Sequence, residues 1–348
     1  MSNPPLVSIL MPVRNEGAFI KRSLGAVLAQ DYPAESLEVI VADGRSTDET
    51  APYVSEIARQ HSNVTLIENP QKIVSTGLNA ALRIAKGEII VRVDGHTVIN
   101  PDYVRACVNA LENSKADNVG GRMSAVGDKL FGRAVAAATS SRFGVGGARF
   151  HYSQKEEWVD TVYLGAWHSA LFRRIGMFDE EMVRNQDDEF NYRLRASGGR
   201  IWLSPKIKSS YFNRATAGSL AKQYFQYGFW KVRVLQKHPG QMKLRQFVPA
   251  LFVIALVILL VNAPIFLVSK VLLSALLLAY TLASIMASVF AARKFGWRLF
   301  PQLPIVFAIM HLAYGSGFIF GLLKFRNRWR FSNRAPQFER PHDTAPVQ

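Results

Sequence analysis

Three uncharged stretches between residues 247 and 323 limit most strongly what this chain can fold into. Residues 247–268 and 271–292 carry no formal charge, and residues 299–323 contain only His311 as a titratable group. The hydrocarbon core of a bilayer is about 30 Å thick and needs about 20 apolar residues of helix. Buried helices of a soluble bundle usually carry a polar stripe, which these stretches lack. The sequence therefore predicts a membrane domain over residues 247–323.

The charges and prolines around these stretches predict their topology. The first residues lack the basic and then apolar pattern of a signal peptide, so we expect the chain before the membrane domain to lie in the cytosol. Three full crossings would place the last residues outside, yet they are rich in the basic residues that favour the cytosolic side. Pro301 and Pro304 begin the last stretch, and Gly315 and Gly317 interrupt it. We therefore predict two full crossings, with a re-entrant or interface-lying last segment and a cytosolic tail.

Composition limits the class of partner. The formal net charge is +16, which favours an anionic partner such as nucleic acid, acidic lipid or the phosphates of a nucleotide. Apolar residues make up 49% of the chain, which excludes an intrinsically disordered protein. Cys107 is the single cysteine, so neither an intrachain disulfide nor a cysteine-based zinc site can form.

Strand-like and helix-like segments alternate over the first 210 residues. This alternation predicts an α/β domain with a mostly parallel sheet and helices on both faces. Ligands of such sheets bind beyond the carboxyl ends of the strands, where residues 12–16, Asp43 and residues 94–96 fall. The predicted strands cover residues 7–11, 37–42, 64–67 and 88–93, and the predicted helices cover residues 16–30, 46–59 and 77–85.

This domain contains an ordered set of motifs at residues 7–16, 41–50, 91–96, 175–180 and 186–194. The ordered set resembles the family 2 glycosyltransferases. The resemblance covers about residues 5–235 and implies a Rossmann-like GT-A fold, a nucleotide-sugar donor and an inverting transfer. The nearest subgroup is the bacterial succinoglycan-type exopolysaccharide enzymes, which also carry C-terminal membrane helices.

Asp94 and His96 are the predicted metal ligands. The diphosphate of a nucleotide-sugar leaves poorly unless its developing charge is neutralised, and a divalent cation does this well. Two residues apart in an extended segment, both side chains lie on one side. The family has an Asp-x-Asp motif here, and His96 replaces the second Asp; imidazole suits Mn²⁺ better than Mg²⁺. A lone Asp-x-His is otherwise typical of a surface turn.

The donor nucleotide is expected at the same edge of the sheet. The Asp43 carboxylate can accept hydrogen bonds from a uracil N–H or a ribose hydroxyl, which suits a UDP-sugar. Helix capping, the other interpretation of Asp43, is better assigned to Ser46 or Asp48. Lys72 follows the third strand and either approaches the nucleotide or is a solvated loop lysine. The predicted nucleotide-binding set is Pro12, Val13, Arg14, Glu16, Asp43, Lys72 and Asp94.

Asp187 is the predicted general base. An inverting transfer needs one base to take the proton of the attacking hydroxyl, and the resemblance assigns this role to the Asp of a Glu-Asp pair. Here the pair reads Gln186-Asp187, which leaves the adjacent Asp188 as an alternative. In a second interpretation, both acids complement the positive N-terminus of the helix that follows.

Mixed aromatic and basic residues indicate contacts with the membrane surface. Residues 218–237 predict an interface helix that binds anionic lipids, and residues 128–143 a second one. Residues 223–228 lack the Arg-Trp part of the motif of processive relatives, which favours addition of a single sugar. Residues 144–149 predict a mobile loop near the acceptor or an ordinary surface loop. The predicted parts are a catalytic domain at 1–215, an interface helix and linker at 216–246, the membrane domain at 247–323 and the basic tail at 324–348.

These features together predict a multi-pass hexosyltransferase of the bacterial cytoplasmic (inner) membrane with a cytosolic catalytic domain. The expected reaction moves a sugar from a nucleotide-sugar to a polyprenyl-diphosphate-linked saccharide in the synthesis of exopolysaccharide or a related glycan. Transfer to a bare polyprenyl phosphate is the alternative. A nucleic-acid-binding membrane protein is not expected, because the positive charges cluster beside the membrane segments and no nucleic-acid motif is present.

Overall fold

The computed structural model describes residues 4–213 and 216–328. They form two compact units. Unit 1 contains residues 4–124 and 153–211, and unit 2 contains residues 125–152, 212–213 and 216–328. Residues 125–152 therefore belong to a different unit from the sequence on either side of them.

The described residues of the sheet form nine strands in the order β3-β2-β1-β4-β8-β6-β9-β5, with β7 paired to β9. The first four strands are parallel and confirm the four predicted strands to within two residues at each end. They are β1 (Val7–Val13), β2 (Leu37–Asp43), β3 (Val64–Glu68) and β4 (Ile89–Arg92). The others are β5 (Thr97–Ile99), β6 (Asn118–Val126), β7 (Glu157–Val159), β8 (Tyr163–His168) and β9 (Ile201–Phe212).

The sheet is mixed rather than mostly parallel, which corrects that part of the prediction. β8 pairs antiparallel with both β4 and β6, and β9 pairs antiparallel with both β5 and β7. Parallel neighbours need a crossover of a dozen or more residues that returns to the same end of the sheet. The helices after β1, β2 and β3 provide such returns, whereas β8 enters the sheet from the opposite end to its neighbours β4 and β6.

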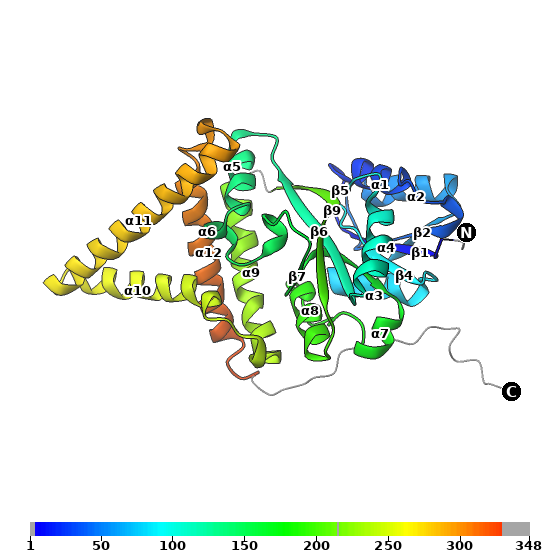
Figure 1. Cartoon of the computed structure of the whole chain (residues 1–348). Helices are drawn as coiled ribbons and strands as arrows, with labels where there is room; N and C mark the ends of the chain where they lie inside the picture. Colours follow the sequence, from blue (N-terminus) through cyan, green and yellow to red (C-terminus); the bar gives the residue numbers. More distant parts are fainter. Residues whose placement is uncertain (1–3, 214–215, 329–348) are drawn as a thin grey trace. The chain divides into compact units, whose positions relative to one another are not determined.

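Helices cover both faces of the sheet in unit 1 (Figure 1). The inward residues of β1 (Val7, Ile9 and Met11) share one apolar cluster with α1 (Ile20–Leu28), α2 (Thr50–Gln60) and α4 (Tyr103–Ser114). On the other face lies α3 (Val74–Ile84), where Gly77 packs against Pro12 and Ala42. There α3 contacts the segment between α7 (Ala170–Ile175) and α8 (Gln186–Ala196), because Asn79 Nδ2 donates to the Phe178 carbonyl (2.8 Å). The short helix η1 (Ala34–Ser36) precedes β2.

The helix predicted at residues 16–30 begins later because its first residues are tied to a distant loop. The backbone N–H groups of Asn15, Glu16 and Gly17 donate to side chains of the loop before α2 and of the first residue of α2. The acceptors are Ser46 Oγ, Thr50 Oγ1 and Asp48 Oδ2, at 2.8–2.9 Å. These bonds fix the segment after β1 as a non-helical loop, and α1 starts only at Ile20.

Unit 2 is mostly helical over its described residues. Its long helices are α9 (Ala217–Lys237), α10 (Val248–Asn262), α11 (Leu267–Phe295) and α12 (Leu303–Lys324). The predicted interface helix at residues 218–237 is confirmed as a helix, α9, and it packs against α12. The predicted helix at residues 128–143 is divided into α5 (Leu130–Thr139) and α6 (Arg142–Val145), so the predicted loop at residues 144–149 is partly helical. The short helices are η2 (Arg149–His151), η3 (Pro239–Gln241), η4 (Leu244–Gln246) and η5 (Trp297–Leu299).

Glycines allow α9 and α12 to approach each other closely. A Cβ at Gly228 of α9 would lie 2.0 Å from the Tyr314 carbonyl oxygen, and one at Gly317 of α12 would lie 2.0 Å from the Phe225 carbonyl oxygen. On the neighbouring side of α12, a Cβ at Gly315 would lie 2.3 Å from the Pro249 carbonyl oxygen of α10. Small residues of this kind let helix backbones pack tightly where apolar burial between helices gives little driving force.

Two helices of the described chain, α11 and α12, are long and apolar enough to cross a membrane. The predicted interruption of the last stretch is wrong, because α12 is continuous over 22 residues. Pro304 lies in the first turn of α12, where proline fits a helix. The glycines of α12 allow neighbouring helices to pack closely. The short helix is α10, whose 15 residues extend about 22 Å, less than the bilayer core of about 30 Å.

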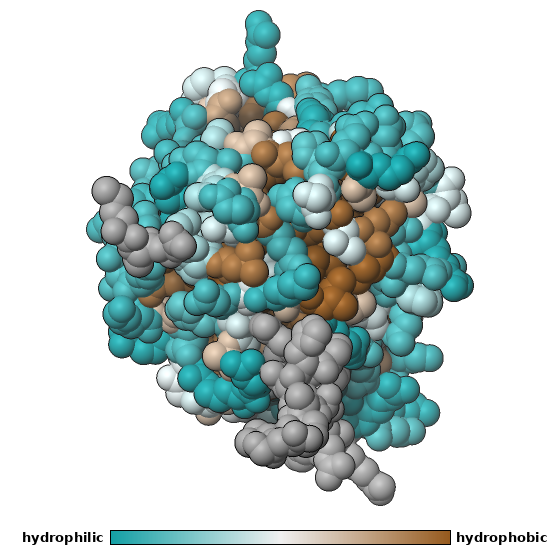
Figure 2. Space-filling view, turned by 90° about the vertical axis from the view of Figure 1, so that its right-hand side faces the viewer, coloured by the Kyte–Doolittle hydropathy of each residue, from teal (hydrophilic) through white to brown (hydrophobic). Residues whose placement is uncertain are grey.

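The two units differ in the polarity of their surfaces. In the described part of unit 1, Ile84 and Trp158 are the exposed large apolar side chains. In unit 2 such side chains are numerous, and at the turn between α10 and α11 Ile265 and Leu267 are 72% and 75% exposed. Figure 2 shows a face that is mostly hydrophilic, with hydrophobic residues near its middle. The exposed α10–α11 hairpin is the part of the described chain that most needs an apolar environment.

Candidate active site

The carboxyl ends of β1, β2 and β4 bring the predicted nucleotide and metal residues to one edge of the sheet. Val13 pairs with Asp43 across β1 and β2, and Leu10 pairs with Arg92 across β1 and β4. Asp94 follows β4 at the same edge. The predicted convergence of these segments is therefore present in the structure.

Asp43 is held by its own turn. Its carboxylate accepts from the Ser46 hydroxyl (2.5 Å) and from the Ser46 backbone N–H (3.0 Å). Asp48, rather than Asp43, supports the start of α2, since it accepts from the Thr50 N–H (3.0 Å) and hydroxyl (2.6 Å). A carboxylate that accepts from these local donors keeps further lone pairs for a ligand. Nucleotide binding by Asp43 is therefore possible in this geometry and stays a prediction.

A buried ion pair fixes Asp94. Arg92 Nε and one terminal nitrogen donate to the two carboxylate oxygens at 2.8 and 3.1 Å, and the two side chains are only 6% and 15% exposed. Burial by itself raises the pKa of the Asp94 carboxyl, but the positive charge of Arg92 outweighs it and lowers the pKa. Asp94 is therefore a fixed, ionised carboxylate.

Glu16 orients His96. Its Oε1 lies 2.9 Å from Nδ1 of the imidazole. An ionised carboxylate only accepts, so this contact places the hydrogen on Nδ1 and leaves Nε2 as the ring nitrogen able to bind a metal. The Tyr211 ring packs edge-on at 5.1 Å between centroids. The structure thus places Glu16, predicted as a nucleotide residue, against the imidazole.

Asp187 lies in the first turn of α8, and the charges of the Arg92–Asp94 pair reach it. Burial raises the pKa of the Asp187 carboxyl, and the neighbouring Asp188 raises it further, while Arg92 opposes them in part. Asp187 Oδ1 accepts from the Asp188 backbone N–H (2.9 Å). A carboxylate with a raised pKa is a stronger base, which suits proton abstraction.

The donor set of Asp94 and His96 fits a divalent metal that completes its coordination with ligand oxygens. No group of three or more His, Cys, Asp or Glu side chains among the described residues could form a cage around a metal. Mg²⁺ and similar ions often use one or two protein ligands together with substrate phosphates and water. Asp94 keeps lone pairs beside Arg92, and His96 keeps Nε2, so two protein ligands are available.

Arg14 and Lys72 are the two predicted nucleotide residues that remain exposed. Arg14 packs along Gly44, where an added Cβ would lie 3.2 Å from the Arg14 side chain. Lys72 adopts a left-handed φ of 63° in the loop before α3, and its N–H donates to the Asn69 carbonyl (3.1 Å). Neither side chain joins the Asp94 cluster in the contacts above.

Arg92 is the site residue that motif reading missed. The available signal was an arginine inside the apolar run of residues 89–93, since charged residues are almost never fully buried unless they are paired. A second missed pair is Glu189 and Arg193 of α8, joined at 2.9 Å. Arg193 also donates to the Met177 carbonyl (2.7 Å) and so joins α8 to the segment after α7.

Comparison with known proteins identifies the domain that contains these residues. Residues 8–177 match the family model described as Glycosyl transferase family 2. The chain contains a family 2 glycosyltransferase domain. This confirms the predicted family and the predicted enzyme class, with a nucleotide-sugar and a saccharide as the partners that membership implies.

Two relatives are similar over nearly the whole chain. The succinoglycan biosynthesis protein ExoA of Rhizobium meliloti (strain 1021) is 29% identical over 94% of this chain and 99% of its own. A dolichyl N-acetyl-α-D-glucosaminyl phosphate 3-β-D-2,3-diacetamido-2,3-dideoxy-β-D-glucuronosyltransferase of Methanococcus voltae is 24% identical over 91% of this chain and 97% of its own.

A solved structure shares the fold. The mannosyltransferase PcManGT from Pyrobaculum calidifontis, in complex with GDP-Man and Mn²⁺, has a TM-score of 0.59 and 22% identity, over 92% of this chain and 88% of its own. The predicted GT-A fold with C-terminal apolar helices is confirmed at the level of fold.

Proposed function

We propose that the protein is an inverting, metal-dependent hexosyltransferase that adds one sugar to a lipid-linked saccharide. The observation that carries this proposal is the charge cluster of Arg92, Asp94 and Asp187 beside His96. It combines two metal-binding side chains with a carboxyl of raised pKa from another element. Such a combination suits displacement of a diphosphate by a hydroxyl.

Asp187 acts as the general base in this proposal. Its carboxylate takes the proton of the acceptor hydroxyl while the new glycosidic bond forms and the bond to the diphosphate breaks on the opposite face of the sugar. Burial and Asp188 raise the pKa of Asp187, which strengthens it as a base. Arg92 holds Asp94 in place and partly balances the negative charge of the site.

Asp94 and His96 would hold a divalent metal, Mn²⁺ or Mg²⁺. The ion would supply positive charge to the leaving diphosphate. Glu16 keeps His96 in the tautomer that presents Nε2, as a carboxylate bonded to the other ring nitrogen does for metal-binding histidines. Asp43, Pro12, Val13, Arg14 and Lys72 remain the proposed nucleotide residues, with a UDP-sugar as the proposed donor.

Unit 2 anchors the enzyme in the bacterial cytoplasmic membrane in this proposal, with the catalytic domain in the cytosol. The support is the exposed apolar surface of α10 and α11 and the two helices long enough to cross. Anionic lipids would contact the basic residues beside these helices. The Methanococcus voltae relative is named for a sugar joined to dolichyl phosphate, which supports a lipid-linked saccharide in exopolysaccharide or related glycan synthesis.

Product analysis tests the proposal. The full chain in lipid nanodiscs is incubated with UDP-hexoses, Mn²⁺ and a lipid extract containing polyprenyl-diphosphate saccharides, and the lipids are examined by mass spectrometry. We expect a mass increase of one hexose on the lipid-linked saccharide, which is lost with excess chelator. A product in which a single hexose is joined to polyprenyl monophosphate would support the alternative acceptor. Full transfer in excess chelator would exclude a requirement for a divalent metal.

A further inference from the structure

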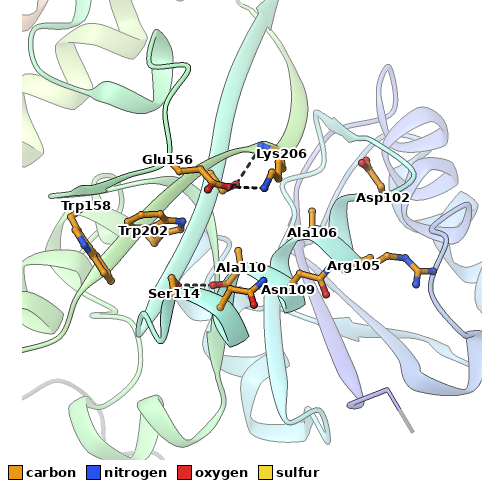
Figure 3. Close-up of a pocket in the computed structure, with 12 residues that line it drawn as sticks. Asp102, Arg105, Ala106, Asn109, Ala110, Ser114, Glu156, Trp158, Trp202 and Lys206 are labelled. Atoms are coloured by element: carbon orange, nitrogen blue, oxygen red, sulfur yellow. Dashed lines mark hydrogen bonds and ion pairs between the residues drawn. The ribbon is translucent and has the colours of Figure 1, made fainter. Parts of the chain in front are cut away.

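A groove with a volume of about 670 Å³ lies in unit 1, outside the active site. It is bounded by α4 and by strands β7 and β9, and none of its lining residues belongs to the Asp94–Asp187 cluster. Figure 3 shows Trp158 and Trp202 at one end, with Asp102 and Arg105 at the other. The volume lies in the range of about 300–1,000 Å³ that is usual for ligand pockets.

Small residues on α4 leave the space for this groove. Ala106 and Ala110 are four residues apart, so they lie on the same face of the helix and line the groove. Asn109 and Asn113 also line it and repeat with the same spacing. The helix therefore presents a floor of two methyl groups with two amides beside it.

Two tryptophans form an aromatic end. Trp158 and Trp202 are direct partners across β7 and β9, with ring centroids 4.7 Å apart at 69°. The Arg200 guanidinium lies 3.5 Å from the Trp158 ring centroid and helps to hold that ring. Trp158 is nevertheless 41% exposed, and only Ile84 shares this exposure among the large apolar side chains of the described part of unit 1.

The amides of the groove are available to a ligand. Asn109 and Asn113 are exposed, and their side chains make no hydrogen bond to any residue that the structure describes. Each amide offers two donor hydrogens and one acceptor oxygen. Hydroxyl groups, which both donate and accept, match such amides well.

The charges of the groove balance. Asp102 and Glu156 supply two negative charges, and Arg105 and Lys206 supply two positive charges. Glu156 and Lys206 pair at 3.3 Å, and Arg105 lies 3.4 Å from an Asp31 carboxylate oxygen outside the groove. In a chain with a net charge of +16, a neutral lining argues against a phosphate or nucleic-acid ligand.

We propose that this groove is a second saccharide-binding site that holds a short, neutral oligosaccharide away from the active site. The C–H faces of the sugars would pack on Trp158 and Trp202, and their hydroxyls would bond to Asn109 and Asn113. The inference rests on the proposed function only in taking the ligand to be part of the glycan on which the enzyme acts.

The groove and the active site lie at different points along β9. Lys206 lines the groove, and Tyr211, five residues further along the strand, packs against His96. Five residues of strand span about 17 Å. The groove therefore lies away from the reacting groups, and it would retain the acceptor or product glycan rather than position the reacting hydroxyl.

Binding of defined tetrasaccharides to the full chain in nanodiscs tests this site. Calorimetry and ligand-observed NMR are run with cellotetraose, laminaritetraose and maltotetraose as neutral probes and with tetragalacturonate as an anionic probe. We expect at least one neutral probe to bind with a Kd on the order of 1 mM, and tetragalacturonate to bind more weakly. Trp158→Ala and Asn109→Ala should each raise the Kd at least tenfold.

Matched variants separate this site from the catalytic one. Glu112→Ala, an exposed position on α4 that does not line the groove, should leave the Kd unchanged. Asp187→Asn should also leave it unchanged, and UDP should not compete. Trp158→Phe controls for loss of the strand pair, since it keeps an aromatic ring and should weaken binding less than Trp158→Ala.

The outcomes distinguish the two proposals. Tetrasaccharide binding without any glycosyl transfer would overturn the proposed function and support the proposed saccharide-binding site. Glycosyl transfer without binding of any neutral probe would overturn the proposal that the groove binds saccharides. Wild-type affinity in both Trp158→Ala and Asn109→Ala would also overturn it. Tighter binding of tetragalacturonate than of the neutral probes would also overturn it.

Discussion

Arg92 shows how a single residue can link folding to chemistry. Its guanidinium is buried in β4 and holds Asp94 through two hydrogen bonds, while its charge also acts on Asp187. Removing one partner of a buried ion pair leaves the other without compensation, which is far more costly than the loss of a surface pair. The same arginine therefore matters for stability and for the active site.

Arg92→Met should destabilise the protein by about 3–5 kcal/mol, because Asp94 is left buried without its partner. The measurement is the unfolding midpoint in denaturant, followed by the fluorescence of unit 1. Arg45→Met is the matched control, since Arg45 pairs with Glu68 at the surface with the side chains 54% and 59% exposed. The control should change stability by about 0–1 kcal/mol. Equal effects of the two variants would contradict a structural role for Arg92.

Asp187→Asn should lower kcat by about 10²–10⁴-fold, the usual contribution of a general base. Nucleotide binding should be retained, because Asp187 acts on the acceptor. The measurements are initial rates and calorimetric titration with the nucleoside diphosphate. Asp188→Asn, the neighbouring carboxyl in the same turn, should be much less impaired. An inactive Asp188→Asn beside an active Asp187→Asn would move the base by one residue.

The raised pKa of Asp187 has a defined effect on the pH profile. The base works ionised, so kcat/KM should fall as the pH falls through its pKa. Burial and Asp188 raise that pKa, so the acid limb should lie above the ordinary range of an aspartate. Asp188→Asn removes the second of these causes and should move the limb to lower pH. A limb that does not move would show that the base responds to another group.

At the scale of elements, the glycines of α9 and α12 decide how closely these helices pack. Gly317→Ala should destabilise unit 2 by about 1–3 kcal/mol, the usual cost of overpacking, because the new Cβ would lie 2.0 Å from the Phe225 carbonyl oxygen. Gly218→Ala at the start of α9 is the control, because nothing lies within 4 Å of its added Cβ. The two variants are compared by thermal unfolding in nanodiscs. A midpoint for Gly317→Ala as high as that for Gly218→Ala would show that the helices can separate at no cost.

At the scale of the whole molecule, the membrane topology is the open question that one reporter can test. If α11 and α12 are the two crossings, the chain after α12 lies on the same side as unit 1, which agrees with the positive-inside rule for its basic residues, whereas Arg293, Lys294 and Arg298 between the two helices would lie on the opposite side. Alkaline phosphatase fused after Gln348 should then be inactive, whereas green fluorescent protein at the same position should fluoresce. An active phosphatase would require a third crossing, which α10 is too short to make without extension.

The sequence by itself determined the elements whose signals are local. Apolar runs ended by Pro12 and by Asp43 predict strands, and the order of parallel strands places their carboxyl ends together, so the site segments could be predicted. The apolar stretches likewise predicted the helices of unit 2. Asp94, His96 and Asp187 could be named as candidates because motif order is a property of the chain.

Only the tertiary structure decided the rest, because the remaining choices depend on contacts between distant residues. The Arg92–Asp94 pair is local, but its effect on Asp187 requires α8 to return to the sheet. The direction of β8 and β9, the short α10 and the continuous α12 follow from packing that no periodicity encodes. The groove exists only because Ala106 and Ala110 of α4 face Trp202 of β9, about 90 residues later along the chain. Charge, burial and space at these points are properties of the assembled fold, since each depends on which distant side chains exclude water from a given group.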